Sequence, residues 1–126
     1  MDYSYDTLTV MVIDDSKTHR LSASRLLQEA GCVVVTATDG FDALSKIADA
    51  KPDIIFIDAL MPRLDGYQTC ALIKNNSRFR ETPVIMLMGK DGDFDTAQAR
   101  IVGCNHALTK PVAAEAWLQT IRDYVQ

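Results

Sequence analysis

The fold class is decided by the stretch Leu8–Asp15, which reads LTVMVIDD. Its first part is apolar and rich in β-branched residues, and two acidic residues stop it. A short run of this kind predicts a strand that is buried on both faces. The acidic pair predicts that the strand ends in a polar loop.

The same pattern returns along the rest of the chain. Further strands are predicted at 33–37, 53–57, 83–88 and 106–109. Helices are predicted between Ser16 and Gly31, between Thr38 or Asp39 and Pro52, through 67–73, over 94–102 and over 112–125. Apolar strands that alternate with amphipathic helices predict an α/β fold, with a doubly wound five-stranded parallel sheet and five helices.

Length and composition favour one acidic domain. The 126 residues fit a single domain over 8–126, preceded by a short mobile segment over 1–7. The chain carries 13 Lys and Arg against 17 Asp and Glu and has no basic cluster, so direct nucleic-acid binding is not expected. Its apolar runs are far shorter than the ~20 residues of a membrane helix. We expect a cytoplasmic protein because no export signal is evident.

Charged residues follow the predicted odd-numbered strands. Asp14 and Asp15 follow the first strand, Asp58 follows the third, and Lys110 follows the fifth. In a doubly wound sheet, ligands bind at the carboxyl ends of the strands, so these four side chains are predicted to converge. Three carboxylates held together repel one another unless a cation lies among them, and oxygen ligands suit Mg²⁺.

This predicted site is electrically balanced. Three carboxylates, one divalent cation and the ammonium of Lys110 carry no net charge together. Such a site can accept a dianionic phosphoryl group, with Asp58 as the nucleophile.

Two enzymes of similar fold fit less well. A phosphohydrolase with an aspartate nucleophile would carry Asp-x-Asp after the first strand, whereas this chain has Asp14-Asp15-Ser16. A flavin protein needs a phosphate-binding nest at that place, and the acidic pair would repel the phosphate.

Three motifs carry a resemblance to a known family. They are Val12–Ser16 (VIDDS), Asp58–Pro62 (DALMP) followed by Asp65-Gly66, and Leu108–Pro111 (LTKP). With them the chain resembles, over nearly its whole length, the receiver domain of response regulators in two-component and chemosensory signalling. The resemblance implies the flavodoxin-like receiver fold for residues 8–126.

The resemblance also implies the roles of the site residues. Asp58 would accept the phosphoryl group from a histidine kinase, and Lys110 would bind it. Asp15, Asp58 and the backbone carbonyl of Leu60 would ligate Mg²⁺, while Asp14 would hold a metal-bound water. The chain would be no enzyme beyond its own phosphorylation and dephosphorylation, and the Lys110-Pro111 bond would be cis.

A closer likeness lies in the segments 10–18, 61–74 and 82–87. They resemble the stand-alone regulators of type IV pilus twitching motility. This implies a chemosensory histidine kinase as one partner and a downstream protein effector as another. The effector would bind the face of the fourth helix, fifth strand and fifth helix.

The chain departs from the family at its switch positions. Receivers carry Thr or Ser where this chain has Met88, and Tyr or Phe where it has Ala107. A thioether donates no hydrogen bond and a methyl group has no rotamer to report. One alternative is therefore a degenerate receiver that acts as a constitutive scaffold. Another is that Met88 simply fills the space of the missing ring.

Other positions near the site are less informative. Leu60 and Lys90 occupy places that flank the path of hydrolytic water in the family. His19 and His106 are isolated in the sequence, and they are assigned no role.

Overall fold

The computed structural model describes residues 3–89 and 96–126. Its five strands form one parallel sheet in the order β2-β1-β3-β4-β5, and they are β1 (Thr9–Ile13), β2 (Val33–Ala37), β3 (Ile54–Asp58), β4 (Val84–Met88) and β5 (His106–Thr109). Five helices connect or follow them: α1 (Lys17–Glu29), α2 (Gly40–Ala50), α3 (Gly66–Asn75), α4 (Thr96–Val102) and α5 (Ala114–Tyr124). The predicted doubly wound α/β fold is confirmed.

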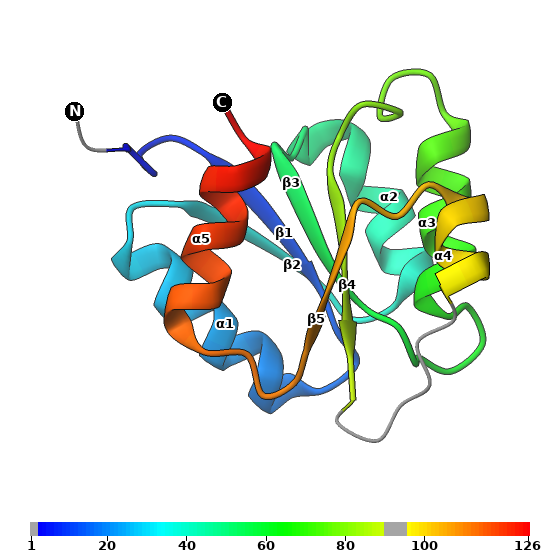
Figure 1. The fold of residues 1–126 in the computed structure, drawn as a ribbon, viewed down its shortest axis with the longest axis horizontal. Helices are drawn as coiled ribbons and strands as arrows, with labels where there is room; N and C mark the ends of the chain where they lie inside the picture. Colours follow the sequence, from blue (N-terminus) through cyan, green and yellow to red (C-terminus); the bar gives the residue numbers. More distant parts are fainter. Residues whose placement is uncertain (1–2, 90–95) are drawn as a thin grey trace.

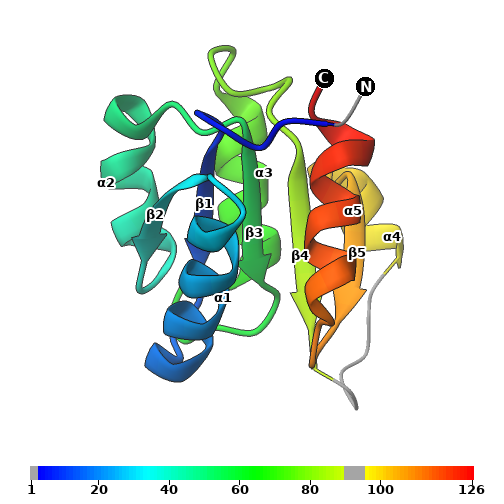
Figure 2. The ribbon, with the colours of Figure 1, turned by 90° about the vertical axis from the view of Figure 1, so that its left-hand side faces the viewer.

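The helices form two layers around the sheet. One layer contains α1 and α5, and the other contains α2, α3 and α4 (Figure 1). The carboxyl ends of the strands lie at the opposite end of the molecule from the two chain termini (Figure 2).

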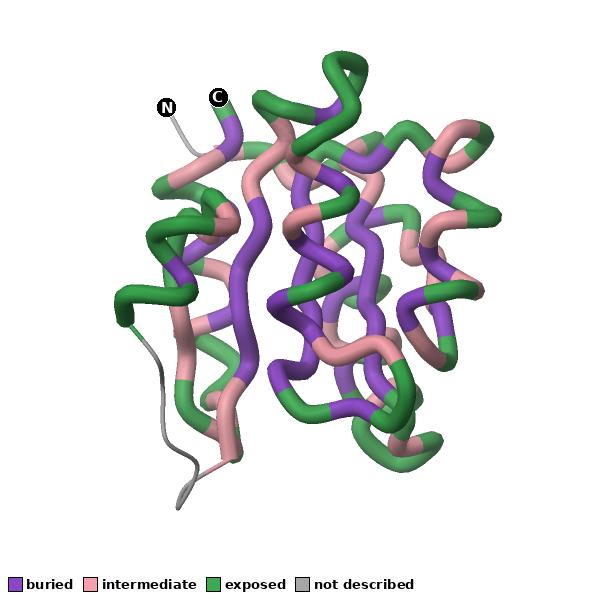
Figure 3. Tube along the Cα trace, turned by 90° about the vertical axis from the view of Figure 1, so that its right-hand side faces the viewer, coloured by how far each residue is buried: buried purple, intermediate pink, exposed green. Residues whose placement is uncertain are grey.

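The core lies on both faces of the sheet, because successive side chains of a strand point to opposite sides. Val10 and Val12 pack with the helices α1 and α5, whereas Met11 and Ile13 pack with α2, α3 and α4. All four residues of β1 from Val10 onward are buried. The central strands are accordingly buried along most of their length (Figure 3), as expected for a parallel sheet that is covered on both faces.

Side-chain caps fix where the first helices begin. The Ser16 hydroxyl accepts a hydrogen bond from the His19 N–H at 3.3 Å, so Ser16 caps α1 as predicted. Between the two candidates for α2, Asp39 is the cap, and its carboxylate accepts from the Asp42 N–H at 2.7 Å. Caps therefore set the first turns that follow β1 and β2.

Two predicted segments, the fourth helix and the mobile N-terminal segment, extend into residues that the structure does not describe. The predicted fourth helix starts at Phe94, which lies outside the described residues, as does Lys90; within the described part α4 begins at Thr96. The Tyr3 hydroxyl donates to the Val125 carbonyl at 2.8 Å, and the Tyr5 hydroxyl donates to the Leu118 carbonyl at 3.1 Å. Residues 3–7 belong to the segment that is predicted to be mobile. In the structure, the Tyr3 and Tyr5 side chains of this segment are hydrogen-bonded to Val125, just after α5, and to α5 itself.

No helix in the described ranges 3–89 and 96–126 combines the length and the apolar character needed to cross a bilayer.

Gly66, the first residue of α3, lets this helix begin in close contact with the backbone at the end of β3. A Cβ at this position would lie 2.5 Å from the Asp58 carbonyl oxygen and 2.8 Å from the Ala59 Cα. Both are backbone atoms, which cannot rotate away. We expect Gly66→Ala to lower the free energy of unfolding by about 1–3 kcal/mol in urea titrations, as overpacking does. The exposed Asn75→Ala in the same helix should change it by less than about 0.5 kcal/mol, and equal effects would contradict the explanation.

Candidate metal and phosphoryl site

The strand register places the two central acidic positions side by side. Ile13, the last residue of β1, pairs with Ile57 of β3, so Asp14, directly after β1, and Asp58, the last residue of β3, come next to each other. The strand order reverses between β1 and β3, since β2 lies on one side of this pair and β4 on the other. Crevices at such a reversal are the usual ligand sites of doubly wound sheets.

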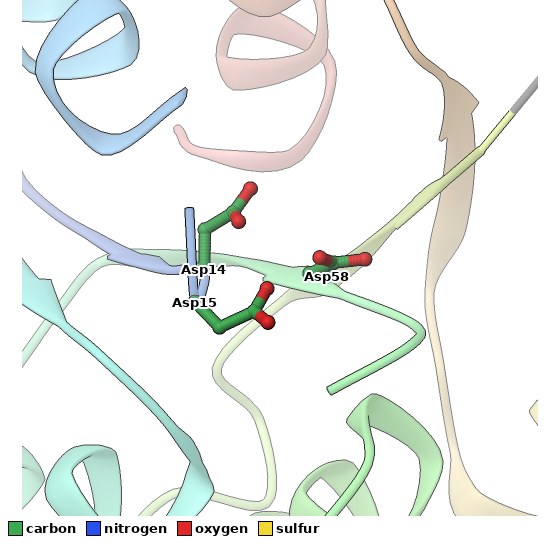
Figure 4. A group of neighbouring side chains, drawn as sticks. All are labelled: Asp14, Asp15 and Asp58. Atoms are coloured by element: carbon green, nitrogen blue, oxygen red, sulfur yellow. The ribbon is translucent and has the colours of Figure 1, made fainter. Parts of the chain in front are cut away.

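Three carboxylates gather at this edge (Figure 4). Asp14, Asp15 and Asp58 each offer an oxygen, and these oxygens all lie within 4.8 Å of one another. Asp14 and Asp58 are buried, with 1% and 8% of their surface exposed, while Asp15 is exposed to solvent. The cluster therefore has an open side through which a ligand can enter.

Lys110 closes the cluster from the end of β5. Its Nζ donates to Asp14 Oδ2 at 2.9 Å and lies 3.2 Å from Asp58 Oδ2. Its backbone N–H donates to the Met88 carbonyl at 2.7 Å, which ties the residue to the end of β4. The Lys110-Pro111 peptide bond is cis, as the family resemblance implies.

The electrostatics of the cluster follow from burial and close charges. Burial raises the pKa of the Asp58 carboxyl above its ordinary value, and the nearby Asp14 raises it further. Lys110 and the Leu60 N–H oppose this rise. Burial works against the ammonium of Lys110, but Asp14 and Asp58 outweigh it, so the pKa of Lys110 lies above its ordinary value.

The donor set fits a hard divalent cation. Carboxylate oxygens are the ligands that Mg²⁺ prefers, and opposite ligands of such an ion lie about 4.2 Å apart. The oxygens of Asp14, Asp15 and Asp58 are spaced within 4.8 Å, so small side-chain movements suffice. With Lys110 included, the cluster carries two negative charges, which one divalent cation balances.

The remaining predicted positions lie around this centre. The N–H of Leu60 donates to Asp58 Oδ1 at 3.2 Å, and the Leu60 residue itself is 67% exposed. Met88 and Ala107 line a cavity of about 510 Å³ between α4 and β5. Both side chains also pack against the core cluster on this face of the sheet.

One neighbour of the site was missed in the sequence. His19, which has no metal-spaced partner in the chain, places its Nδ1 3.3 Å from Lys110 Nζ and 3.5 Å from Asp14 Oδ2. The two positions His19 and Lys110 are 91 residues apart, so no local pattern indicates the contact. The one sequence feature that indicates a place near the site is that His19 lies in the first turn of the helix that follows Asp14-Asp15.

The fold and the site together define a class: a doubly wound α/β protein with an acidic, lysine-closed centre at the carboxyl edge of its sheet. The chain belongs to the response regulator receiver domain family, which matches residues 10–122.

Relatives support this assignment over nearly the full chain. Protein PilG of Pseudomonas aeruginosa is 62% identical over 125 residues, which cover 99% of this chain and 93% of PilG. Protein PilH of the same organism is 31% identical over 112 residues, covering 89% of this chain and 93% of PilH. The structure of the chemotaxis response regulator CheY4 of Vibrio cholerae superimposes with a TM-score of 0.87 at 32% identity, covering 94% of this chain and 99% of CheY4.

Proposed function

We propose that this receiver accepts a phosphoryl group on Asp58 from the phosphohistidine of a kinase. An Asp58 carboxylate oxygen attacks the phosphorus, a P–O bond forms, and the P–N bond breaks with its electron pair returning to the imidazole ring. The product is an aspartyl phosphate. The observation that carries the proposal is the 3.2 Å approach of Lys110 Nζ to Asp58 Oδ2 inside the carboxylate cluster.

The other residues of the cluster have supporting roles in this proposal. Lys110 donates to an oxygen of the transferred group and offsets its negative charge. Asp15, Asp58 and the Leu60 carbonyl would ligate Mg²⁺, and Asp14 would hold a water of the ion. When bound, Mg²⁺ neutralises charge on the phosphoryl oxygens.

The likeness to PilG and PilH supports a place for this chain in the chemosensory control of type IV pili. Its partners are then a chemosensory histidine kinase and a protein effector. The effector contacts α4, β5 and α5, and signalling runs through protein contact.

Amide NMR spectra of the protein alone, with Mg²⁺, and with Mg²⁺ plus beryllofluoride test the proposal. Beryllofluoride stands in for the phosphoryl group on Asp58. We expect Mg²⁺ to shift the amides around Asp14, Asp15 and Asp58, and beryllofluoride to extend the shifts to Met88, Ala107 and α5. In an Asp58→Asn variant, the beryllofluoride shifts should be absent.

The extent of the shifts separates the proposal from its alternative. Shifts that stop at the carboxylates would indicate that Met88 and Ala107 no longer transmit a change, as in a receiver with a constant binding surface. Failure of the wild type to respond to beryllofluoride in Mg²⁺ would contradict phosphoryl acceptance itself.

A further inference from the structure

Three acceptors surround the ammonium group of Lys110. Asp14 Oδ2 lies at 2.9 Å, Asp58 Oδ2 at 3.2 Å and His19 Nδ1 at 3.3 Å. An ammonium has three N–H donors and no acceptor, so it can only donate to the imidazole. The contact therefore requires the tautomer of His19 that presents the Nδ1 lone pair to Lys110 and carries the ring proton on Nε2.

We propose that His19 is a positioning residue for Lys110 in the phosphoryl-accepting site. It engages one N–H of the ammonium from α1, and Asp14 engages another. The third N–H remains directed at Asp58, where the proposed phosphoryl group is attached. This inference rests on the proposed function, because it concerns how Lys110 meets that group.

The imidazole is well placed for this task because the start of α1 is tied to the site. The N–H of His19 is held by the Ser16 hydroxyl, and the N–H of Ser16 donates to Asp14 Oδ1 at 2.9 Å. Arg20, the next residue of the helix, donates to the Asp14 carbonyl at 2.7 Å. These bonds fix the backbone of His19 relative to Asp14, so the turn that carries the imidazole is tied to the site.

Lys110 needs such support on the side that faces α1 and α5. A cavity of about 350 Å³ adjoins it there, and Asp14, His19, Leu26, Val112 and Trp117 are among its lining residues. A lysine side chain is long and flexible, and open space beside it allows other rotamers. The His19 contact opposes that movement.

The contact with His19 is also independent of the chemistry at Asp58. When a phosphoryl group is attached, the partner of one N–H changes from a carboxylate oxygen to a phosphoryl oxygen. The contacts with Asp14 and His19 need no change. Lys110 can thus keep its place while its third partner is exchanged, which is the purpose of a preorganised site.

Substitutions that move the acceptor test this inference. His19→Ala removes the acceptor, His19→Asn keeps an oxygen at the δ position of the lost Nδ1, and His19→Gln moves the oxygen one atom outward. The affinity of each variant for beryllofluoride is measured at saturating Mg²⁺, for example by the NMR titration above. Thr18→Ala, exposed on the same turn, is the matched control.

We expect His19→Ala and His19→Gln to weaken beryllofluoride binding by about threefold to tenfold, the range of one hydrogen bond. His19→Asn and Thr18→Ala should remain within about twofold of the wild type. Rescue by Asn but not by Gln is a pattern that loss of helix stability would not produce, and urea titrations of all variants verify that each is folded.

Two results would overturn the inference. One is equal affinity of all variants, and the other is a loss in His19→Asn as large as that in His19→Ala. In both cases the wild type still binds beryllofluoride. Absence of binding by the wild type would instead refute the proposed function, so the two failures are distinguishable.

Discussion

Asp58→Asn is expected to abolish phosphorylation of this receiver. The amide is neutral and a poor nucleophile, and it cannot form the acyl phosphate that a carboxylate forms. Intact-mass measurement after incubation with acetyl phosphate and Mg²⁺ should show one added phosphoryl group on the wild type and none on the variant.

The control for this prediction is Asp49→Asn, which makes the same chemical change on the exposed side of α2. It should be phosphorylated like the wild type. A phosphoryl group retained by Asp58→Asn would place the acceptor elsewhere, with Asp15 as the nearest exposed carboxylate of the cluster.

The same Asp58→Asn variant should be more stable than the wild type at neutral pH without Mg²⁺. Burial, together with Asp14, raises the pKa of Asp58 above its ordinary value of 3.8. Between that value and the higher pKa of the folded state, the folded protein binds more protons than the unfolded chain, so stability falls as the pH rises. Above the folded pKa the full penalty of the charged Asp58 is present.

The neutral amide of the Asp58→Asn variant would lack this penalty. Thermal midpoints of the variant and the wild type should therefore be closest near pH 3.8 and below, and should diverge as the pH rises to neutrality. A wild type that is more stable than the variant at pH 7 would show that the Lys110 contact outweighs the burial of Asp58.

Among the substitutions proposed for this protein, Phe56→Ala is expected to lower the free energy of unfolding the most. The side chain lies in the middle of β3 with 0% exposure, and its ring centroid is 4.6 Å from that of Trp117 on α5. Removing a buried aromatic ring loses its transfer free energy and leaves a cavity. We expect the free energy of unfolding to fall by about 3–5 kcal/mol in urea titrations.

Phe41→Ala is the matched control because Phe41 is 54% exposed on α2. Its ring lies 5.5 Å from the Arg63 guanidinium carbon, a contact whose loss costs about 1 kcal/mol at an exposed site. Similar losses for the two variants would contradict the assignment of Phe56 to the core between the sheet and α5.

The sequence alone determined the fold class and the acidic centre. Apolar runs such as Leu8–Ile13 indicate buried strands because the local pattern of apolar residues shows which residues avoid water. Once the strands are parallel, their carboxyl ends meet at one edge. Asp14 and Asp58, which directly follow or end two such strands, must then lie near each other, as the register shows.

Only the tertiary structure decided which other side chains reach this centre. His19 meets Lys110 across 91 positions of sequence, and Tyr3 meets Val125 across 122. Gly66 must lack a Cβ because the Asp58 carbonyl oxygen of β3 lies too close to it. Hydrophobic periodicity indicates which face of a helix or strand is buried. It does not determine how the helices and strands are rotated and spaced relative to one another. Those follow from packing the whole chain, and they determine which polar atoms come within hydrogen-bonding distance.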